Sequence, residues 1–120
     1  MKPSEVLAQM RDVLETRGWT QKRYVDGLGR RCLLGAAAGT RQGIWRPELC
    51  AANSAALTAL EHKIVEMYPG SAGICSFNSF PFNSFPGDSI SIFNDAPGRT
   101  LQEVFDLIDK TRIGLEEKGQ

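Results

Sequence analysis

The chain has 120 residues, a formal net charge of zero, 42% hydrophobic residues and 23% charged residues. This length suits one domain that buries a core without disulfides or a structural metal, and the composition is typical of a soluble globular protein. A pI near 6.6 lies well below the basic range expected of a dedicated nucleic-acid-binding domain. No apolar run approaches the length of a membrane span, and the amphipathic amino terminus is unlike a signal peptide. We therefore expect residues 1–120 to form a single globular domain without membrane association.

Cysteine and histidine usage argues against a metal centre. The three cysteines, Cys32, Cys50 and Cys75, show no paired metal-type spacing, and His62 is the only histidine. An odd number of cysteines favours reduced thiols in a cytoplasmic protein. We expect neither a metal nor another cofactor.

The first predicted helix runs from Ser4 to Arg17. Five of its side chains recur at the spacing of a single apolar helix face, namely Val6, Leu7, Met10, Val13 and Leu14. Gly18 is a suitable terminator. The next segment, Trp19 to Tyr24, fits an extended or a helical conformation, and its sequence leaves both open.

Positive charge is concentrated in the first part of the chain. Residues 1–46 contain nine Lys and Arg against four Asp and Glu, whereas residues 47–120 contain five against ten. The densest basic stretch runs from Arg17 to Arg46. Such clustering can mark contact with phosphate or nucleic acid, but it also fits a solvated surface or pairing with the acidic half, within one chain or across a symmetric dimer. The candidate contacts for an anion or nucleic acid are Lys22, Arg23, Arg30 and Arg31.

Two further helices are predicted in the middle of the chain. A short one, rich in Leu and Ala, runs from Cys32 to about Ala38, and its small residues suit a helix pressed into the core. A longer one spans roughly Glu48 to Met67, between two prolines. Its apolar stripe consists of Leu49, Ala52, Ala56, Leu60, Ile64 and Met67. His62 lies opposite this stripe, so we expect it on a solvated helix surface.

A tandem Phe-Asn-Ser-Phe-Pro repeat occupies residues 77–86 and contains four of the six phenylalanines. Its prolines exclude a helix and limit any strand to a sheet edge. Solvent-facing rings would form an apolar patch, which monomers usually avoid. Two interpretations stay open, a loop folded back over the core or an aromatic contact surface for another protein or a second copy of the chain. The contact residues of the second interpretation are Phe77, Phe80, Phe82 and Phe85.

The segment that follows combines a short apolar run with a tight turn. Alternation over Ser89–Phe93 predicts a short strand, which would pair with an extended piece such as one near Ile74. Pro97 and Gly98 suit a type II turn over Ala96–Arg99. The simplest interpretation of the segment is a connector between a strand and a helix.

Thr100 and Glu103 have the spacing of a capping box and predict a final helix that runs from Thr100 to about Leu115. A helix amino terminus attracts anions, and Arg99 would lie just outside this one, although Glu103 already places a carboxylate there. Two interpretations of this turn therefore remain, an anion-binding site and a contact surface for another protein. Its candidate contact residues are Asn94, Asp95 and Arg99.

Two short segments of the chain have the residue patterns that are most useful for recognising a protein family. Cys32–Ala36 reads Cys-Leu-Leu-Gly-Ala, and Phe93–Thr100 reads Phe-Asn-Asp-Ala-Pro-Gly-Arg-Thr before the final helix. In both, the chain resembles a family of small actinobacterial and mycobacteriophage proteins of unknown function. The similarity spans roughly residues 19–111, with Phe93 where that family more often has Trp and with the Phe-rich repeat outside its pattern. The resemblance implies a cytoplasmic protein of phage or actinobacterial origin, and it carries no catalytic residue across.

No convincing catalytic site is predicted. The chain offers a possible nucleophile in Cys32, a base in His62 and an orienting acid in Asp95. Nothing in their sequence spacing predicts that these three side chains lie close together. Residues 35–40 lack the glycine spacing and the Lys-Ser/Thr ending of a phosphate-binding loop.

We therefore predict a mainly α single domain with three longer helices, one short helix and a short β element. The alternative is a small α+β fold in which Trp19–Tyr24 or Gly73–Phe77 supplies a second strand. The preferred function is a small cytoplasmic interaction or regulatory protein, linked to phage, that binds a host or self partner through its aromatic segment, with a homo-oligomer as one form. The alternative is a nucleic-acid or nucleotide-binding regulator that uses the basic segment 17–46.

Overall fold

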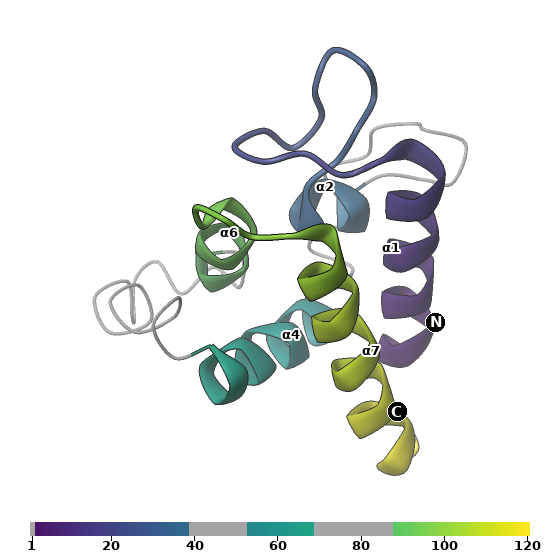
Figure 1. Ribbon diagram of the computed structural model, residues 1–120. Coiled ribbons are helices and arrows are strands. Elements are labelled where there is room, and N and C mark those ends of the chain that lie inside the picture. The colour runs from purple at the N-terminus through teal and green to yellow at the C-terminus, as the bar shows by residue number, and fades with distance from the viewer. Residues whose placement is uncertain (1, 39–52, 69–87) are drawn as a thin grey trace.

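Helix α7 (Leu101–Glu117) packs against α1 (Pro3–Arg17) and α4 (Ser54–Met67) in the computed structural model of the chain. The structure describes residues 2–38, 53–68 and 88–120. Two shorter helices complete the described part: α2 (Leu33–Ala38) packs on α1, and α6 (Asp88–Asp95) packs on α2 and α4 (Figure 1). The prediction of a mainly α fold is confirmed. None of the helices in the described part is long and apolar enough to cross a membrane.

Local sequence explains the ends of α1. Pro3 occupies the first turn, where its missing N–H costs nothing, and the Lys2 amide donates to Glu5 Oε1 at 2.7 Å. At the other end, Gly18 adopts a φ of 95°, and its amide donates to the Leu14 carbonyl at 2.9 Å. The residues predicted for its apolar face are all buried, namely Val6, Leu7, Met10, Val13 and Leu14.

For each of the other two long helices, one predicted end agrees with the structure and the other end differs from it. Helix α4 begins at Ser54 because Asn53 before it has a non-helical backbone, with φ −101° and ψ 19°. The prediction of one continuous helix from Glu48 to Met67 is therefore wrong at Asn53, and residues 48–52 lie outside the described residues. Helix α7 begins after Thr100, as the capping box predicts, and continues to Glu117.

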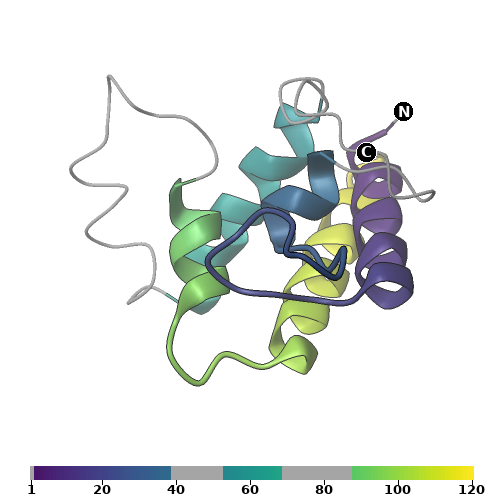
Figure 2. The ribbon, with the colours of Figure 1, turned by 90° about the horizontal axis from the view of Figure 1, so that it is seen from above.

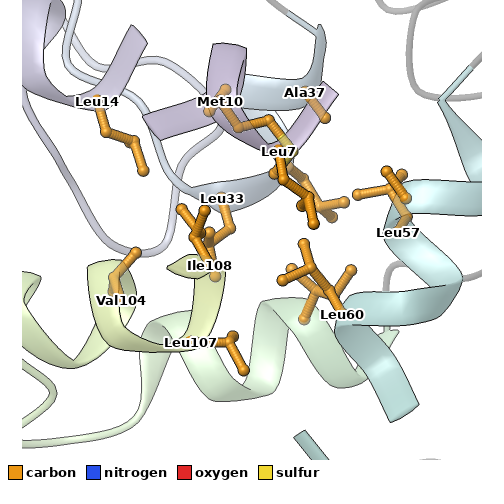
Figure 3. Close-up of a cluster of buried hydrophobic side chains, with 14 of the residues drawn as sticks. Leu7, Met10, Leu14, Leu33, Ala37, Leu57, Leu60, Val104, Leu107 and Ile108 are labelled. Carbon is orange, nitrogen blue, oxygen red and sulfur yellow. The ribbon is translucent and has the colours of Figure 1, made fainter. Parts of the chain in front are cut away.

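The core lies where α1, α2, α4 and α7 meet (Figure 3). Leu7 of α1, Leu33 of α2, Leu60 of α4 and Ile108 of α7 are fully buried. Burial of one such side chain stabilises the fold by about 1.5–3 kcal/mol relative to leaving it exposed. Leu57 and Leu107 are also buried, and Leu57 is not part of the stripe predicted for its helix. Apolar side chains from helices that are distant in the sequence are therefore buried against one another, and this burial stabilises the fold.

Residues 88–95 form helix α6, so the predicted short strand at Ser89–Phe93 is wrong. Ile90 and Phe93, three residues apart, are both fully buried, whereas Ile92 is 41% exposed. A short apolar run fits either periodicity, and packing against α4 and α2 selects the helical one. The predicted strand partner near Ile74 lies outside the described residues.

The segment between α1 and α2 forms a long loop, residues 18–32, which we call the 18–32 loop. It runs from the end of α1 toward α6 and back to α2 (Figure 2). In the described residues the only β pairing consists of isolated bridges, Trp19 with Arg31 and Val25 with Arg31. The question left open for Trp19–Tyr24 is thereby answered: the segment is neither a helix nor a continuous strand.

Candidate functional site

Asn94, in the last turn of α6, joins three segments that are far apart in the sequence. Its side chain is buried, and its Oδ1 accepts hydrogen bonds from Trp19 Nε1 at 2.8 Å and from the Leu33 amide at 3.1 Å. Its Nδ2 donates to the Thr20 carbonyl at 3.1 Å and to Asp95 Oδ1 at 3.0 Å. The Leu33 amide is at the first turn of α2 and has no partner within that helix, so Asn94 supplies one. We call this set of contacts the Asn94 junction.

Neighbouring residues of the 18–32 loop strengthen this attachment to α6. Gln21 Nε2 donates to the carbonyls of Asn94 at 2.9 Å and Ala96 at 3.1 Å. The Lys22 amide donates to Asp95 Oδ1 at 2.7 Å, and Lys22 adopts a φ of 68°. A left-handed backbone at a residue other than glycine is unfavourable, and it persists where surrounding contacts hold it in place.

The start of α2 fixes the opposite side of the loop. Cys32 Sγ accepts a hydrogen bond from the Gly35 amide at 3.3 Å, and the Cys32 amide donates to the Tyr24 carbonyl at 3.3 Å. A Cβ atom at Gly35 would lie 2.0 Å from the Tyr24 oxygen, so this close approach requires glycine. Burial raises the pKa of the Cys32 thiol, as does the charge of Asp95, while the amides of Gly35 and Leu34 oppose the shift. Cys32 is therefore a neutral capping group.

These contacts border a cavity of about 220 Å³ that is open to solvent and lies between the loop, α2 and α6. Its polar lining combines cations from the loop with a carboxylate from α6. Its less polar lining comes from the loop and from the start of α2. The lining residues are Lys22, Arg23, Tyr24, Cys32, Leu34, Ser91, Asn94 and Asp95.

The tip of the 18–32 loop is held by Asp26. Its Oδ1 accepts from the amides of Leu28 and Arg30, both at 2.9 Å, and its Oδ2 accepts from Arg30 Nε at 2.6 Å. Partial desolvation raises the pKa of Asp26, but these hydrogen bonds outweigh it and leave the pKa below its ordinary value. The tip carries exposed apolar side chains, with Leu28 79% exposed and Tyr24 51% exposed. A well-ordered turn therefore presents an apolar group to solvent.

The four predicted basic contacts do not share one surface. Lys22 and Arg23 are exposed and line the cavity. Arg30 is paired with Asp26. Arg31 is buried, and burial together with the nearby charge of Arg17 lowers its pKa. Only Lys22 and Arg23 are thus brought together as exposed cations beside the cavity.

Arg99 closes the turn after α6. Its Nε donates to the Phe93 carbonyl at 2.9 Å, and its guanidinium lies over the rings of Phe93 and Tyr68, at 3.9 Å and 4.8 Å from their centroids. It also pairs with Glu103 at 3.4 Å. Its side chain is only 9% exposed. These contacts place the predicted contact residue Arg99 within the fold.

The three residues named as a catalytic group are not brought together in the described part of the chain. Cys32 and Asp95 both line the cavity, but His62 is exposed on α4 and lines a separate depression of about 140 Å³ between α4 and α7. No group of three or more His, Cys, Asp and Glu residues among those described can hold a metal ion. The predicted aromatic contacts lie outside the described residues, namely Phe77, Phe80, Phe82 and Phe85.

Sequence analysis identified Asn94 and Asp95 but not their partners. Trp19, Gln21 and Leu33 are 61 to 75 residues away from Asn94 or its carbonyl, and no local pattern pairs them. The cavity lining also includes Tyr24, Leu34 and Ser91, which were not among the predicted site residues. A buried asparagine that satisfies distant backbone groups is visible only in the folded chain.

The comparison with protein families gives one match. Residues 1–112 match the family of unknown function DUF6197. No curated protein and no solved structure matches the chain. The two segments singled out in the sequence, Cys32–Ala36 and Phe93–Thr100, lie within the matched range and meet at the Leu33–Asn94 hydrogen bond. The chain belongs to the family of unknown function DUF6197.

Proposed function

We propose that this protein is a small interaction and regulatory protein that binds a partner protein with an acidic surface, and that the tip of the 18–32 loop is part of its contact surface. The observation that carries the proposal is Leu28, which is 79% exposed at the tip of a turn held by Asp26. An exposed apolar side chain on a pre-organised loop loses little conformational entropy on binding. Lys22 and Arg23 on the same loop favour an acidic partner.

Residues 77–86 form the second part of the proposed contact surface. Four phenylalanines in ten residues supply the aromatic side chains that are enriched at interfaces. The resemblance to actinobacterial and mycobacteriophage proteins supports a cytoplasmic host protein, or a second copy of this chain, as the partner. The loop tip and the Phe-rich repeat are separate parts of the proposed contact surface. Each part is therefore tested with its own variants.

The test is capture with a photo-crosslinking residue at position 27, beside Leu28, where an added side chain meets nothing within 4 Å. The protein is incubated with an actinobacterial lysate treated with nuclease, and mass spectrometry is the readout. Leu28→Ser should abolish capture, whereas the matched variant Val65→Ser, at a 49% exposed position on α4, should retain it. Equal capture by both variants would reject the loop tip as the contact. Phe80→Ser and Phe82→Ser test the Phe-rich repeat, and retained capture by both would reject that element. Circular dichroism of each variant checks that helical content is unchanged.

A nucleic-acid or nucleotide-binding regulator is the second candidate, favoured by the exposed cations Lys22 and Arg23 beside the cavity. Binding of this kind weakens steeply as salt rises, because counterions are released from the phosphates. A labelled oligonucleotide titrated at several salt concentrations distinguishes the candidates. Salt-sensitive binding lost in a Lys22→Gln, Arg23→Gln variant supports the second candidate, and absent or salt-insensitive binding removes it.

A further inference from the structure

The cavity between the 18–32 loop, α2 and α6 has the size of a site for a small metabolite. Its volume of about 220 Å³ lies below the ~300–1,000 Å³ of pockets for drug-sized ligands. It exceeds the ~150 Å³ of an engineered cavity that takes up benzene. The volume therefore limits the ligand to a small molecule.

The walls of the cavity are organised before any ligand binds. Asp95 Oδ1 accepts from both the Lys22 amide and Asn94 Nδ2, which orients the Asp95 carboxylate and holds the loop backbone. On the opposite side, the contact between Gly35 and the Tyr24 carbonyl fixes the loop against α2. A preformed site binds its ligand without the entropy cost of ordering its own walls.

The charges of the lining select a ligand that carries both signs. Lys22 and Arg23 supply positive charge from the loop, and Asp95 supplies negative charge from α6. A simple anion would leave the Asp95 carboxylate without a partner of opposite charge, and a simple cation would lie beside two like charges. Both hydrogen bonds to Asp95 described above end at Oδ1.

The remaining lining residues add an apolar and neutral wall. Leu34 and Cys32 are buried residues that line the cavity. Because burial raises its pKa, the Cys32 thiol stays neutral and adds no charge. Such a wall suits a short apolar or weakly polar side chain.

We propose that this cavity binds a free α-amino acid, with the carboxylate of the ligand on Lys22 and Arg23 and its ammonium group on Asp95. The side chain of the amino acid then lies toward Leu34 and Cys32. The amino-acid site shares Lys22 and Arg23 with the proposed partner surface but not Leu28, which does not line the cavity. Leu28→Ser should therefore leave amino-acid binding unchanged, so the two proposals can fail separately.

The test is a nuclear magnetic resonance titration of the isotopically labelled full chain with each common L-α-amino acid, up to about 10 mM, a range that detects a Kd near 1 mM. Binding should shift the amide signals of residues 22–24, Ser91 and Asp95 in a saturable manner. For each amino acid that binds, the deaminated acid and the carboxamide are titrated in the same way. Both should bind at least about tenfold more weakly, because each lacks one charge-assisted contact. No saturable shift at these amides with any amino acid would overturn the proposal.

Variants separate the two charge contacts. Asp95→Asn keeps an acceptor for the Lys22 amide but removes the charge, and Arg23→Gln removes a cation. Each should weaken amino-acid binding by about tenfold or more. The matched controls on α7, Asp106→Asn and Lys110→Gln, should bind as the unmodified protein does. Equal binding by all four variants would overturn the proposal.

A third variant covers the case in which Asp95→Asn disturbs the fold. Ser91→Leu adds side-chain volume toward the cavity from α6 and leaves the Lys22–Asp95 hydrogen bond in place. It should remove amino-acid binding while the dispersion of the spectrum stays that of a folded protein. Binding by a folded Ser91→Leu variant that equals binding by the unmodified protein would locate the amino acid elsewhere and overturn the proposal.

Discussion

The bundle of α1, α4 and α7 and the Asn94 junction are held together by different interactions. In the bundle, apolar side chains such as Leu7, Leu60 and Ile108 are fully buried against one another. In the junction, one asparagine makes four hydrogen bonds, three of them to two distant stretches of chain and one to the neighbouring Asp95. Apolar burial is non-directional and tolerates changes of shape, whereas a buried hydrogen-bonding group requires each partner at one distance and angle.

This difference explains why the candidate sites lie at the junction. A loop held by directional bonds keeps its backbone in one conformation, including the unfavourable one at Lys22. Binding residues are often found on loops that a rigid scaffold positions. The bundle thus provides most of the free energy of folding, and the junction fixes the conformation of the 18–32 loop. Substitutions in the two regions should therefore have different effects, and these are given in order from the largest to the smallest.

Leu60→Ala should give the largest loss, about 2–5 kcal/mol of unfolding free energy, because it leaves a cavity in a fully buried part of the bundle. Urea unfolding followed by circular dichroism measures this loss. Amide hydrogen exchange should accelerate in the bundle and in the junction alike, since the whole domain is destabilised. A loss no larger than that of the exposed variant Val65→Ala would contradict the assignment of Leu60 to the core.

Asn94→Ala should cost about 2–3 kcal/mol, because it leaves the buried partners Trp19 Nε1 and the Leu33 amide without their acceptor. Its effect should be local as well as global. In hydrogen exchange, the Leu33 amide should lose protection while the Ile108 amide remains protected up to global unfolding. The control Asn53→Ala removes a single hydrogen bond to the Ala37 carbonyl and should cost less. Equal losses of protection at Leu33 and Ile108 would argue against a separate junction.

Gly35→Ala should destabilise by about 1–3 kcal/mol, because the added Cβ collides with the Tyr24 carbonyl, a backbone atom that cannot move without displacing the loop. Gly114→Ala is the matched control on α7, where an added Cβ meets nothing within 4 Å. That variant should stabilise by about 0.8–1.0 kcal/mol through helix propensity. Opposite signs in urea unfolding are the expected outcome, and stabilisation by both variants would disprove the close approach of α2 to the loop.

The smallest effect concerns pH and the start of α7. The hydrogen bond from the Thr100 amide lowers the pKa of Glu103 below its ordinary value of 4.5, and the Arg99 charge adds to this shift against partial desolvation. A carboxyl whose pKa is lower in the folded state stabilises the fold above its unfolded pKa, and this contribution is lost as pH falls through the folded pKa. Glu103→Gln should therefore be less stable than the unmodified protein at neutral pH.

Thermal unfolding at a series of pH values checks this prediction. The difference between Glu103→Gln and the unmodified protein should shrink as pH falls below 4.5 and should disappear at still lower pH. Glu117→Gln, exposed near the end of α7, serves as the control and should follow the unmodified protein at every pH. A difference that persists unchanged to low pH would assign the effect of Glu103 to packing and not to charge.

Features that depend on a few consecutive residues were predicted correctly from the sequence. The apolar face of α1 and the capping box of Thr100 and Glu103 are confirmed. The turn before α7 is also confirmed, with Gly98 at a φ of 78° and a hydrogen bond of 3.1 Å from the Arg99 amide to the Ala96 carbonyl. These features follow from side-chain periodicity and from backbone restrictions, which act within one or two turns of the chain.

Features that depend on distant segments were decided only by the tertiary structure. The run Ser89–Phe93 is too short to distinguish a strand from a helix, and packing of Ile90 and Phe93 decides for α6. Arg31 belongs to a basic stretch in the sequence, but folding buries it. Asn94 meets Trp19 and Leu33 across more than 60 residues. Local interactions determine which segments are helical, whereas the choice of buried polar partners, and with it the shape of the cavity, follows from how those segments pack.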